Sequence, residues 1–300
     1  MGKKAAIVVS YNPEIEVLTA LLTSLSVQVD MLILVDNGGA ASLVDDLCAL
    51  HDIKYVPMGN NAGLGAALNA GFQIAVSGGA EYVVTFDQDS HAAPSLIADL
   101  AVAMLNAMAV DANCIAVSPM FFDRRERNET NFPFYQTVGN KIVPVTRSET
   151  GSGLISADTL ITSGMYVRAA VWTQGLKYDE TMFVDFTDTE WCFRARGQGY
   201  SLYGCSHIRM GHALSDAPPI KIFGLAFFRY APLRRYFYFR NTIAVVLKNH
   251  TPKIWKKRLI LGLILRFTVN IIIDRNRIRS IYMMSKGILH GIRRSLGPWH

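Results

Sequence analysis

The sequence predicts an α/β protein with a Rossmann-like, mostly parallel central sheet, followed by a basic amphipathic helical region at the C-terminus. Three observations support this fold class. Short apolar runs alternate with longer segments of helical period from residue 5 to about residue 119, which is typical of parallel sheets. Polar residues follow the points where several apolar runs stop. The charge of the chain changes sign near residue 220.

The expected elements follow from the length and period of each segment. Short apolar runs predict strands at residues 5–10, 31–36, 53–57, 82–86 and 114–119. Apolar residues at helical spacing predict helices at residues 15–28, 42–51, 64–77 and 94–108. Pro13 and Pro94 lie near helix starts, and Gly78-Gly79 marks a helix end.

The second half of the expected body is less regular. Residues 121–149 are polar, charged and without clear period, so we expect an excursion near the acceptor side or a mobile loop. Periodicity returns at residues 160–162, followed by a Ser163-Gly164 turn and by expected helices near residues 168–174 and 188–198. The chain shows no internal repeat.

Composition sets bounds on class and compartment. The chain has 300 residues, of which 50% are hydrophobic, enough for one large domain with an appendage or for two modest domains. The four cysteines show neither Cys-x-x-Cys spacing nor a partnering histidine cluster, which favours reduced thiols in a cytoplasmic protein (Cys48, Cys114, Cys192, Cys205). The apolar run at residues 5–9 is too short for a signal peptide, so we expect no secretion.

The net charge of +6 is unevenly distributed along the chain. Residues 1–220 carry 13 Lys and Arg against 23 Asp and Glu, whereas residues 221–300 carry 17 against the single acid Asp274. This asymmetry indicates an acidic body joined to a basic region that contacts nucleic acid or a membrane surface. We expect the body at residues 1–216 and the basic region at residues 217–300.

An acidic pair follows one of the expected strands. In Asp87-Gln88-Asp89 the two carboxylates lie just past the carboxyl end of residues 82–86, where open α/β sheets bind their ligands. Mg²⁺ and Mn²⁺ take oxygen ligands and complete their shells with water and phosphate oxygens. The pair therefore predicts a metal and a nucleoside-diphosphate substrate, with a solvated surface turn as the alternative.

Two earlier strand ends deliver further polar groups to the same edge, in Ser10-Tyr11-Asn12 and in Asp36-Asn37-Gly38-Gly39. The carboxylate of Asp36 is suited to accept a hydrogen bond from the N3–H of thymine or uracil. A capped turn explains the same residues equally well, because Asp-Asn-Gly is strong turn chemistry.

A run of small residues opens the expected helix at residues 64–77. The run from Gly59 to Gly71 lets a ligand approach the backbone and the helix N-terminus closely, but it lacks the Walker pattern. Tight packing of the helix on the sheet is the alternative.

Three acids begin the expected helix at residues 188–198, namely Asp185, Asp188 and Glu190. One of them is a candidate general base that takes the proton of an acceptor hydroxyl, whereas capping of the helix N-terminus is the alternative. Arg194 lies one turn after Glu190 and is placed to orient it through an ion pair. His212 follows the last strand of the body and is a candidate metal ligand, although a lone histidine is more often structural.

Taken in order, these motifs resemble those of inverting family-two glycosyltransferases of GT-A fold, and within them the bacterial rhamnosyltransferases. The resemblance covers about residues 5–216 and rests on Val9-Ser10-Tyr11-Asn12, Val35-Asp36-Asn37-Gly38, Asn61-Ala62-Gly63-Leu64-Gly65 with Asn69-Ala70-Gly71, Asp87-Gln88-Asp89-Ser90, residues 183–194 and His212.

The resemblance implies a role for each matched residue. Asp36 contacts the pyrimidine and Asp87 the nucleoside, while Asp89 binds the Mn²⁺ or Mg²⁺ that bridges the diphosphate, with Asp87 and His212 as further ligands. Further substrate contacts are implied for Tyr11, Asn12, Asn61, Gly63, Asn69, Gln88, Glu190, Trp191 and Arg194.

The family's Glu-Asp base motif is Thr187-Asp188 in this chain. The resemblance therefore makes Asp188 the catalytic base, while the missing acid leaves Asp185 and Glu190 as candidates for its role. The implied reaction is a single displacement at the anomeric carbon, in which dTDP-β-L-rhamnose gives an α-L-rhamnosyl product.

The basic region has the composition of helices that lie on a membrane. Residues 253–273 join Lys256-Lys257-Arg258 to an apolar run that Arg266 and Asn270 interrupt, too short for the about 20 apolar residues that span a bilayer. An interfacial helix fits better. Stacking on single-stranded nucleic acid, cover for the body, and pairing with a second subunit in a homodimer are the alternatives.

The combined expectation is a cytoplasmic enzyme, peripherally associated with the inner face of the plasma membrane. It transfers L-rhamnose from dTDP-β-L-rhamnose to a lipid-linked oligosaccharide acceptor, for an O-antigen or rhamnan type of bacterial surface polysaccharide, and binds no nucleic acid. A UDP-hexose donor is the alternative within this mechanism. A non-enzymatic nucleic-acid-binding protein is the alternative of another class.

Overall fold

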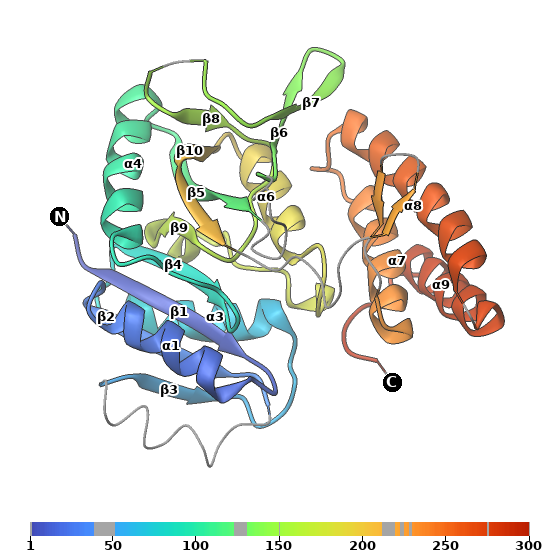
Figure 1. Cartoon of the computed structure of the whole chain (residues 1–300), viewed down its shortest axis with the longest axis horizontal. Coiled ribbons are helices and arrows are strands. Elements are labelled where there is room, and N and C mark those ends of the chain that lie inside the picture. Colours follow the sequence, from blue (N-terminus) through green and yellow to red (C-terminus); the bar gives the residue numbers. More distant parts are fainter. Residues whose placement is uncertain are drawn as a thin grey trace.

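The computed structural model describes residues 2–38, 52–122, 131–149, 151–211, 220–222, 225–227, 230–274 and 276–299. An α/β body lies beside a group of C-terminal helices (Figure 1). Cys48, the helix expected at residues 42–51, His212 and the boundary expected at residue 216 lie outside the described residues.

The body is built on an eight-stranded sheet in the order β3-β2-β1-β4-β9-β5-β10-β8. Strands β1 to β4 are parallel neighbours, whereas β9 runs antiparallel between β4 and β5, and β8 runs antiparallel to β10. The mostly parallel sheet expected from the sequence is therefore confirmed. The strands are β1 (Lys4–Ser10), β2 (Met31–Asp36), β3 (Lys54–Pro57), β4 (Tyr82–Asp87), β5 (Cys114–Phe122), β8 (Leu154–Ser156), β9 (Met165–Arg168) and β10 (Ser201–Gly211).

Helices cover both faces of this sheet. On one face lie α1 (Ile15–Ser26) and α4 (Leu96–Val110), and on the other lie α3 (Leu64–Ser77), α5 (Ala170–Thr173) and α6 (Thr187–Gly197). Helix α1 shows why these segments form helices, because Leu18, Leu21, Leu22 and Leu25 follow the helical repeat and are all buried. The two apolar layers fix the carboxyl ends of β1, β2 and β4 at one edge of the body.

Two expectations from the sequence are wrong. Residues 134–145 are not a mobile loop but a hairpin of β6 (Phe134–Val138) and β7 (Lys141–Val145), joined by a tight turn in which Gly139 has φ +56°. The helix expected at residues 168–174 shrinks to the four residues of α5, because the segment before it pairs with β4 and β5 as β9. Strands β6 and β7, together with β8 and β9, are only three to five residues long, too short for a clear period.

The C-terminal region forms a short hairpin, β11 (Ile220–Ile222) and β12 (Leu225–Phe227), and three mutually packed helices (Figure 1). The helices are α7 (Pro232–Leu247), α8 (Lys253–Ile273) and α9 (Arg277–Ile292). Val245 and Trp255 of this region pack with Met182 and Phe193 of the body in one apolar cluster. Within the described residues, none of the helices combines the length and the apolar character needed to cross a bilayer.

Candidate active site

A cavity of about 820 Å³ opens where the body meets α7. One wall comes from the carboxyl ends of β1 and β4, through Tyr11, Asp87 and Gln88. The opposite wall comes from residues 183–188, which we call the base loop, and from the start of α7. The volume falls within the usual range for pockets that hold organic ligands.

The strand ends form a polar edge beside this cavity. Asp36 is only 4% exposed, and its carboxylate accepts hydrogen bonds from the Tyr55 hydroxyl at 2.8 Å and the Gly38 amide at 3.0 Å. Asn37, which lines the cavity, donates to the side chain of Asn61 at 3.1 Å. This network brings the second and third sequence motifs together.

Tyr11 and Asn12 continue this edge from the end of β1. The Tyr11 amide donates to the Gln88 side chain at 2.6 Å, and the Tyr11 side chain is 48% exposed. Asn12 adopts a left-handed backbone with φ +46°. The structure thus links the first motif to the acidic turn after β4.

The acidic pair lies at the turn that follows β4, as the sequence predicts. Asp87 lines the cavity, and Asp89 is exposed in the same turn. Among the described residues, no group of three or more His, Cys, Asp or Glu side chains is arranged to hold a metal ion. The two carboxylates still fit Mg²⁺ or Mn²⁺, because these ions take oxygen ligands and fill the rest of the shell with water and phosphate.

The chain that leads to His212 passes next to this turn. Gly211, the last residue of β10, forms an isolated antiparallel bridge with His91, two residues after Asp89. His212 itself is outside the described residues, and its role as a metal ligand stays a prediction.

Asp188 faces the cavity from the first turn of α6. Burial, reinforced by the negative charges of Asp87 and Asp185, raises the pKa of the Asp188 carboxyl to about 6, although a hydrogen bond from the Thr189 amide opposes the shift. A carboxylate with this pKa is basic enough to accept a proton and is still largely ionised near neutral pH. Asp188 therefore has both the place and the proton affinity of a general base.

The base loop has an unusual backbone. Phe183, Asp185 and Phe186 have φ values of +64°, +57° and +64°, a region that L-residues other than Asn and Asp rarely occupy. Such conformations persist only where the surroundings enforce them, and they gather at functional sites. Three of them within four residues, directly before Asp188, mark this loop as the specialised part of the site.

The glycine run packs against the base loop. Gly63 has φ +93°, and a Cβ added there would lie 2.7 Å from the carbonyl oxygen of Phe183. The amide of Leu64 at the start of α3 donates to that oxygen at 2.6 Å. The small residue thus serves close packing of α3 on the loop, which was one of the two interpretations of this motif.

Four residues expected to contact substrate have their polar atoms engaged within the protein. The side chain of Asn69 bonds to Tyr178, Trp172 and Glu180, and the indole of Trp191 donates to the carbonyl of Leu176. Glu190 and Arg194 pair with each other at 2.9 Å. None of Asn69, Glu190, Trp191 and Arg194 lines the cavity. The structure therefore does not bring them together with Asp87 and Asp188.

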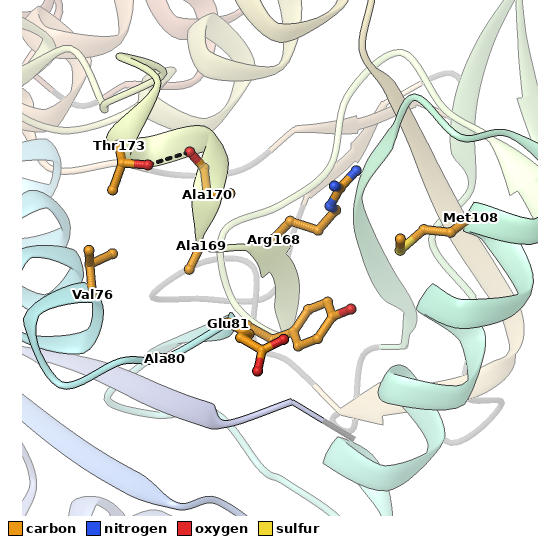
Figure 2. A pocket seen from close by; sticks show the side chains of 9 residues that line it. Val76, Ala80, Glu81, Met108, Arg168, Ala169, Ala170 and Thr173 are labelled. Carbon is orange, nitrogen blue, oxygen red and sulfur yellow. Dashed lines mark hydrogen bonds between the residues drawn. The ribbon is translucent and has the colours of Figure 1, made fainter.

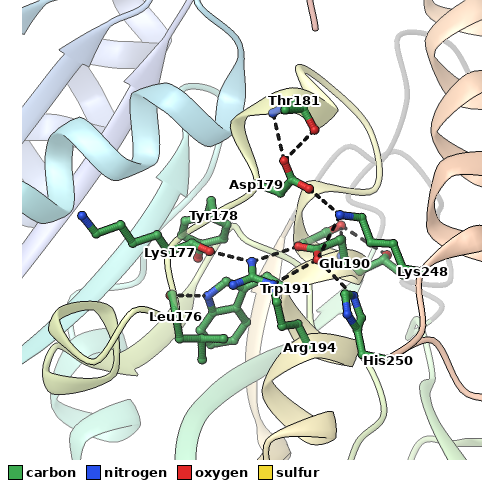
Figure 3. Close-up of polar contacts among 12 residues, drawn as sticks. Leu176, Lys177, Tyr178, Asp179, Thr181, Glu190, Trp191, Arg194, Lys248 and His250 are labelled. Atoms are coloured by element: carbon green, nitrogen blue, oxygen red, sulfur yellow. Dashed lines mark hydrogen bonds and ion pairs between the residues drawn. The ribbon is translucent and has the colours of Figure 1, made fainter. Parts of the chain in front are cut away.

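Glu190 instead centres a polar cluster between α6 and the C-terminal region, shown in Figure 3. It is 1% exposed and lies 3.0 Å from His250 Nε2 and 3.7 Å from Lys248 Nζ. Lys248 also pairs with Asp179 at 2.6 Å. The ion pair of Glu190 with Arg194, predicted from their spacing, is present within α6, while the contacts of Glu190 with Lys248 and His250 join the body to the segment after α7.

The first two turns of α7 and the segment just before it supply cavity residues that the sequence analysis did not identify. Tyr230, Leu233, Arg234 and Phe237 all line the cavity, and Arg234 is the only cation among its described lining residues. The Arg234 guanidinium lies 3.4 Å from Asp185 Oδ1. The aromatic and arginine-rich composition of residues 223–238 was the available signal, but the basic region was assigned to a membrane surface, nucleic acid, cover for the body or a second subunit, and not to the active site.

A second and smaller cavity, of about 320 Å³, lies at the opposite end of β4 beside Glu81 and Tyr82 (Figure 2). Arg168 and Met108 contribute to its lining. The amino end of a strand is not where parallel sheets usually bind ligands, so the larger cavity is the candidate active site.

Comparisons with known proteins agree with this geometry. Residues 5–156 match the family model described as glycosyl transferase family 2. The dTDP-rhamnosyl transferase RfbF of Shigella flexneri is 30% identical over 288 residues, which cover 96% of this chain and 95% of the relative.

Solved structures support the fold. The structure of S. aureus TarS 1-349 in complex with UDP-GlcNAc aligns with a TM-score of 0.56 at 14% identity, covering 97% of this chain and 81% of that chain. The structure of GalNAc-T7 with UDP, GalNAc and Mn²⁺ aligns with a TM-score of 0.58 at 13% identity, covering 86% of this chain and 53%, or about half, of that chain. At this identity the likeness concerns the fold alone, which is that of GT-A glycosyltransferases.

The family model spans half of the chain, and the relative spans nearly all of it. The cavity at the carboxyl ends of the parallel strands is lined by Asp87 and Asp188, two of the acidic residues on which the family resemblance rests. We conclude that the chain belongs to glycosyl transferase family 2 and is a glycosyltransferase.

Proposed function

We propose that this enzyme transfers L-rhamnose from dTDP-β-L-rhamnose to a lipid-linked glycan, with inversion, during synthesis of a bacterial surface polysaccharide. The observation that carries the transfer chemistry is the Asp188 carboxyl, whose pKa is raised to about 6 in the cavity that Asp87 also lines. The choice of donor is supported by the 30% identity to a dTDP-rhamnosyl transferase along 96% of the chain.

In this proposal the strand ends bind the nucleotide. The Asp36 carboxylate, which Tyr55 and Gly38 orient through hydrogen bonds, accepts the N3–H of thymine in this proposal. Tyr11 and Gln88 are supported as donor contacts by their place in the cavity lining. The same lining includes Asn61, whose side chain is oriented by Asn37.

Asp188 acts as the general base. It takes the proton of the acceptor hydroxyl as that oxygen attacks the anomeric carbon from the face opposite the leaving nucleoside diphosphate. A single displacement inverts the configuration, so a β-linked donor gives an α-linked product. Asp185 in the base loop supports this assignment, because its charge helps to keep the pKa of Asp188 high.

The leaving diphosphate carries negative charge that the site must accommodate. Asp87 and Asp89, with His212 as a further candidate, would hold Mn²⁺ or Mg²⁺, which supplies charge neutralisation to the diphosphate when bound. Among the described lining residues Arg234 is the cation available for that task. Its guanidinium, 3.4 Å from Asp185 Oδ1, has the planar fork geometry that suits a phosphate.

The C-terminal helices carry the features of a membrane-surface site. Exposed apolar side chains lie on α8 and α9 at Leu261, Ile264, Leu265, Ile272, Ile278, Ile281, Tyr282, Leu289 and Ile292. Exposed cations accompany them at Lys253, Lys257, Arg258, Arg277, Arg279, Arg293 and Arg294. This combination favours peripheral binding to anionic lipids, where a lipid-linked acceptor is found. Membership of a glycosyltransferase family favours binding to a membrane surface over the alternative of nucleic-acid binding.

A donor panel tests the proposed reaction. We expect turnover of dTDP-β-L-rhamnose with a lipid-linked acceptor in the presence of Mn²⁺ or Mg²⁺, detected as release of dTDP. The Asp188→Asn variant is the control for background hydrolysis. Turnover of a UDP-hexose without turnover of dTDP-rhamnose would overturn the donor assignment.

Vesicle binding tests the membrane proposal separately. We expect co-sedimentation with vesicles that contain phosphatidylglycerol, and a loss of at least fivefold in the Ile264→Asp, Ile272→Asp double variant. Val102 on α4 is 48% exposed on the body, so Val102→Asp is a matched control that leaves binding unchanged. Equal binding by all three proteins would contradict the assignment.

A further inference from the structure

Helix α7 carries two adjacent polar side chains that are completely buried. Arg240 and Asn241 are both 0% exposed. Neither lines the cavity, and neither is assigned a role by the reaction described above. Burying a guanidinium and an amide is costly unless each polar atom finds a partner, so their partners indicate what they do.

The partners of Asn241 are backbone carbonyls of the base loop and the residue before it. Its Nδ2 lies 2.7 Å from the carbonyl oxygen of Met182 and 2.9 Å from that of Asp185, and it also donates to Val184. One amide group thus contacts three carbonyls within four residues. Contacts of this kind depend on the path of the backbone and not on the side chains of the loop.

Arg240 completes the arrangement. Its Nη2 donates to the Met182 carbonyl at 3.1 Å, and its Nη1 donates to the Gly297 carbonyl at 2.5 Å. Its Nε donates to Asn241 Oδ1 at 2.9 Å. Because the oxygen of the Asn241 amide accepts this hydrogen bond, the NH₂ group of the same amide points toward the loop.

The loop that these residues hold is the one with the strained backbone. Phe183, Asp185 and Phe186 all have positive φ, which the isolated chain disfavours. Without partners for the inward-facing carbonyls, the loop would relax to ordinary backbone conformations. Asp188 follows Phe186 by only two residues, so such a relaxation moves the carboxylate relative to the cavity.

We propose that Arg240 and Asn241 are positioning residues for the catalytic base, and we call them the α7 clamp. They hold the base loop in its left-handed conformation and so set where Asp188 presents its carboxylate. This inference rests on the proposed role of Asp188 as the base. It gives the C-terminal helices a second task beside membrane binding, because α7 controls the geometry of the reaction directly.

The clamp makes a specific prediction about Asn241→Asp. The substitution keeps the shape but replaces the donating NH₂ by an oxygen that repels the carbonyls. We expect amide hydrogen exchange in residues 183–188 to accelerate at least tenfold, with exchange in β1 and β4 unchanged. We also expect kcat to fall at least 100-fold while the dissociation constant for dTDP with Mn²⁺ changes less than threefold.

A matched control and a second variant keep the test decisive. Asn270→Asp makes the same change in α8, where the Asn270 amide donates to the Arg266 carbonyl of its own helix and, among the described residues, makes no contact with the base loop. We expect no loop-specific effect. Arg240→Lys retains the charge but loses the Nε bond that orients Asn241, and we expect a milder form of the Asn241→Asp pattern, about tenfold in kcat. Exchange that accelerates throughout the body in both variants would show a merely structural role and overturn the clamp.

The outcomes separate this inference from the proposed function. Loop-specific exchange effects in a protein that does not use dTDP-rhamnose would uphold the clamp and refute the donor. Normal rhamnosyl transfer, with kcat and exchange of Asn241→Asp within threefold of the wild type, would uphold the donor and refute the clamp.

Discussion

The two walls of the active-site cavity are built in different ways. The first wall consists of side chains at the ends of β1, β2 and β4, where a hydrogen-bonded parallel sheet fixes the backbone. The second wall is the base loop, in which three residues with positive φ lie against α3 on one side and α7 on the other. The first wall owes its shape to regular structure, whereas the second depends on tertiary contacts from distant parts of the chain.

This difference suggests a division of labour. The strand ends offer groups suited to a nucleotide and can be rigid before any ligand arrives. The base loop presents Asp188, and its conformation depends on the C-terminal helices that also carry the exposed apolar and basic residues. Changes in the two walls should therefore have separable effects on donor binding and on transfer.

Replacement of Asp188, the proposed base, should give the largest effect. We expect Asp188→Asn to lower kcat by about 10³-fold or more, because the amide cannot accept the acceptor proton. Donor binding, measured by calorimetry with dTDP and Mn²⁺, should change less than threefold. Equal losses of kcat and donor affinity would mean that Asp188 belongs to the donor-binding wall, and the comparison would fail.

Removal of the Glu190 carboxylate from the polar cluster between α6 and the C-terminal region should have the next largest effect. Glu190→Gln removes the only carboxylate that pairs with Arg194 and His250 in the described part of the cluster. We expect a loss of about 3 kcal/mol in the free energy of unfolding, since the cations remain partly buried. Urea denaturation measures it, with Glu16→Gln on the exposed start of α1 as a control that should stay within about 0.5 kcal/mol.

Gly63 lies where the start of α3 contacts the base loop. Gly63→Ala should destabilise the protein by about 2–3 kcal/mol, from the positive φ and from the clash with the Phe183 carbonyl. Gly59 also has positive φ, +75°, but open space around it. Gly59→Ala should therefore cost only about 1 kcal/mol in thermal or urea unfolding. Similar losses in both variants would remove the packing argument.

The pH dependence of transfer tests the role of Asp188 in the second wall. Asp188 must be ionised to accept a proton, and its pKa is about 6. We expect kcat to fall about tenfold per pH unit below that value and to level off above it, with the nucleotide affinity following a different profile. A kcat that stays constant down to pH 5 would argue against a buried carboxylate base.

The sequence predicted the first wall well for a physical reason. Parallel strands buried on both faces are continuous apolar runs, and the polar residues that end them stand out, as in Val84-Thr85-Phe86-Asp87. The helices at Leu64–Ser77 and Ile15–Ser26 were equally clear from their repeats. Family resemblance then picked out Asp188 from the three acids near the start of α6.

The second wall could not be predicted in the same way. The positive φ of Phe183 and Phe186 has no local signal, because neither residue type favours it. Glu190, Trp191 and Asn69 belong to motifs, but their partners lie up to 111 positions away in the chain. The contribution of Arg234, Arg240 and Asn241 arises from the docking of α7, which the periodicity of residues 232–247 alone does not reveal.

The central place of β9 has a consequence for dissecting this protein. Strand β9 lies between β4 and β5, although it follows both in the chain. A fragment ending at residue 156, where the family match stops, would lack the piece that joins the two halves of the sheet. It would present two open sheet edges and invite aggregation. A fragment designed to keep the central sheet intact should therefore include both β9 and β10, and the sheet cannot be completed during synthesis until both have been made.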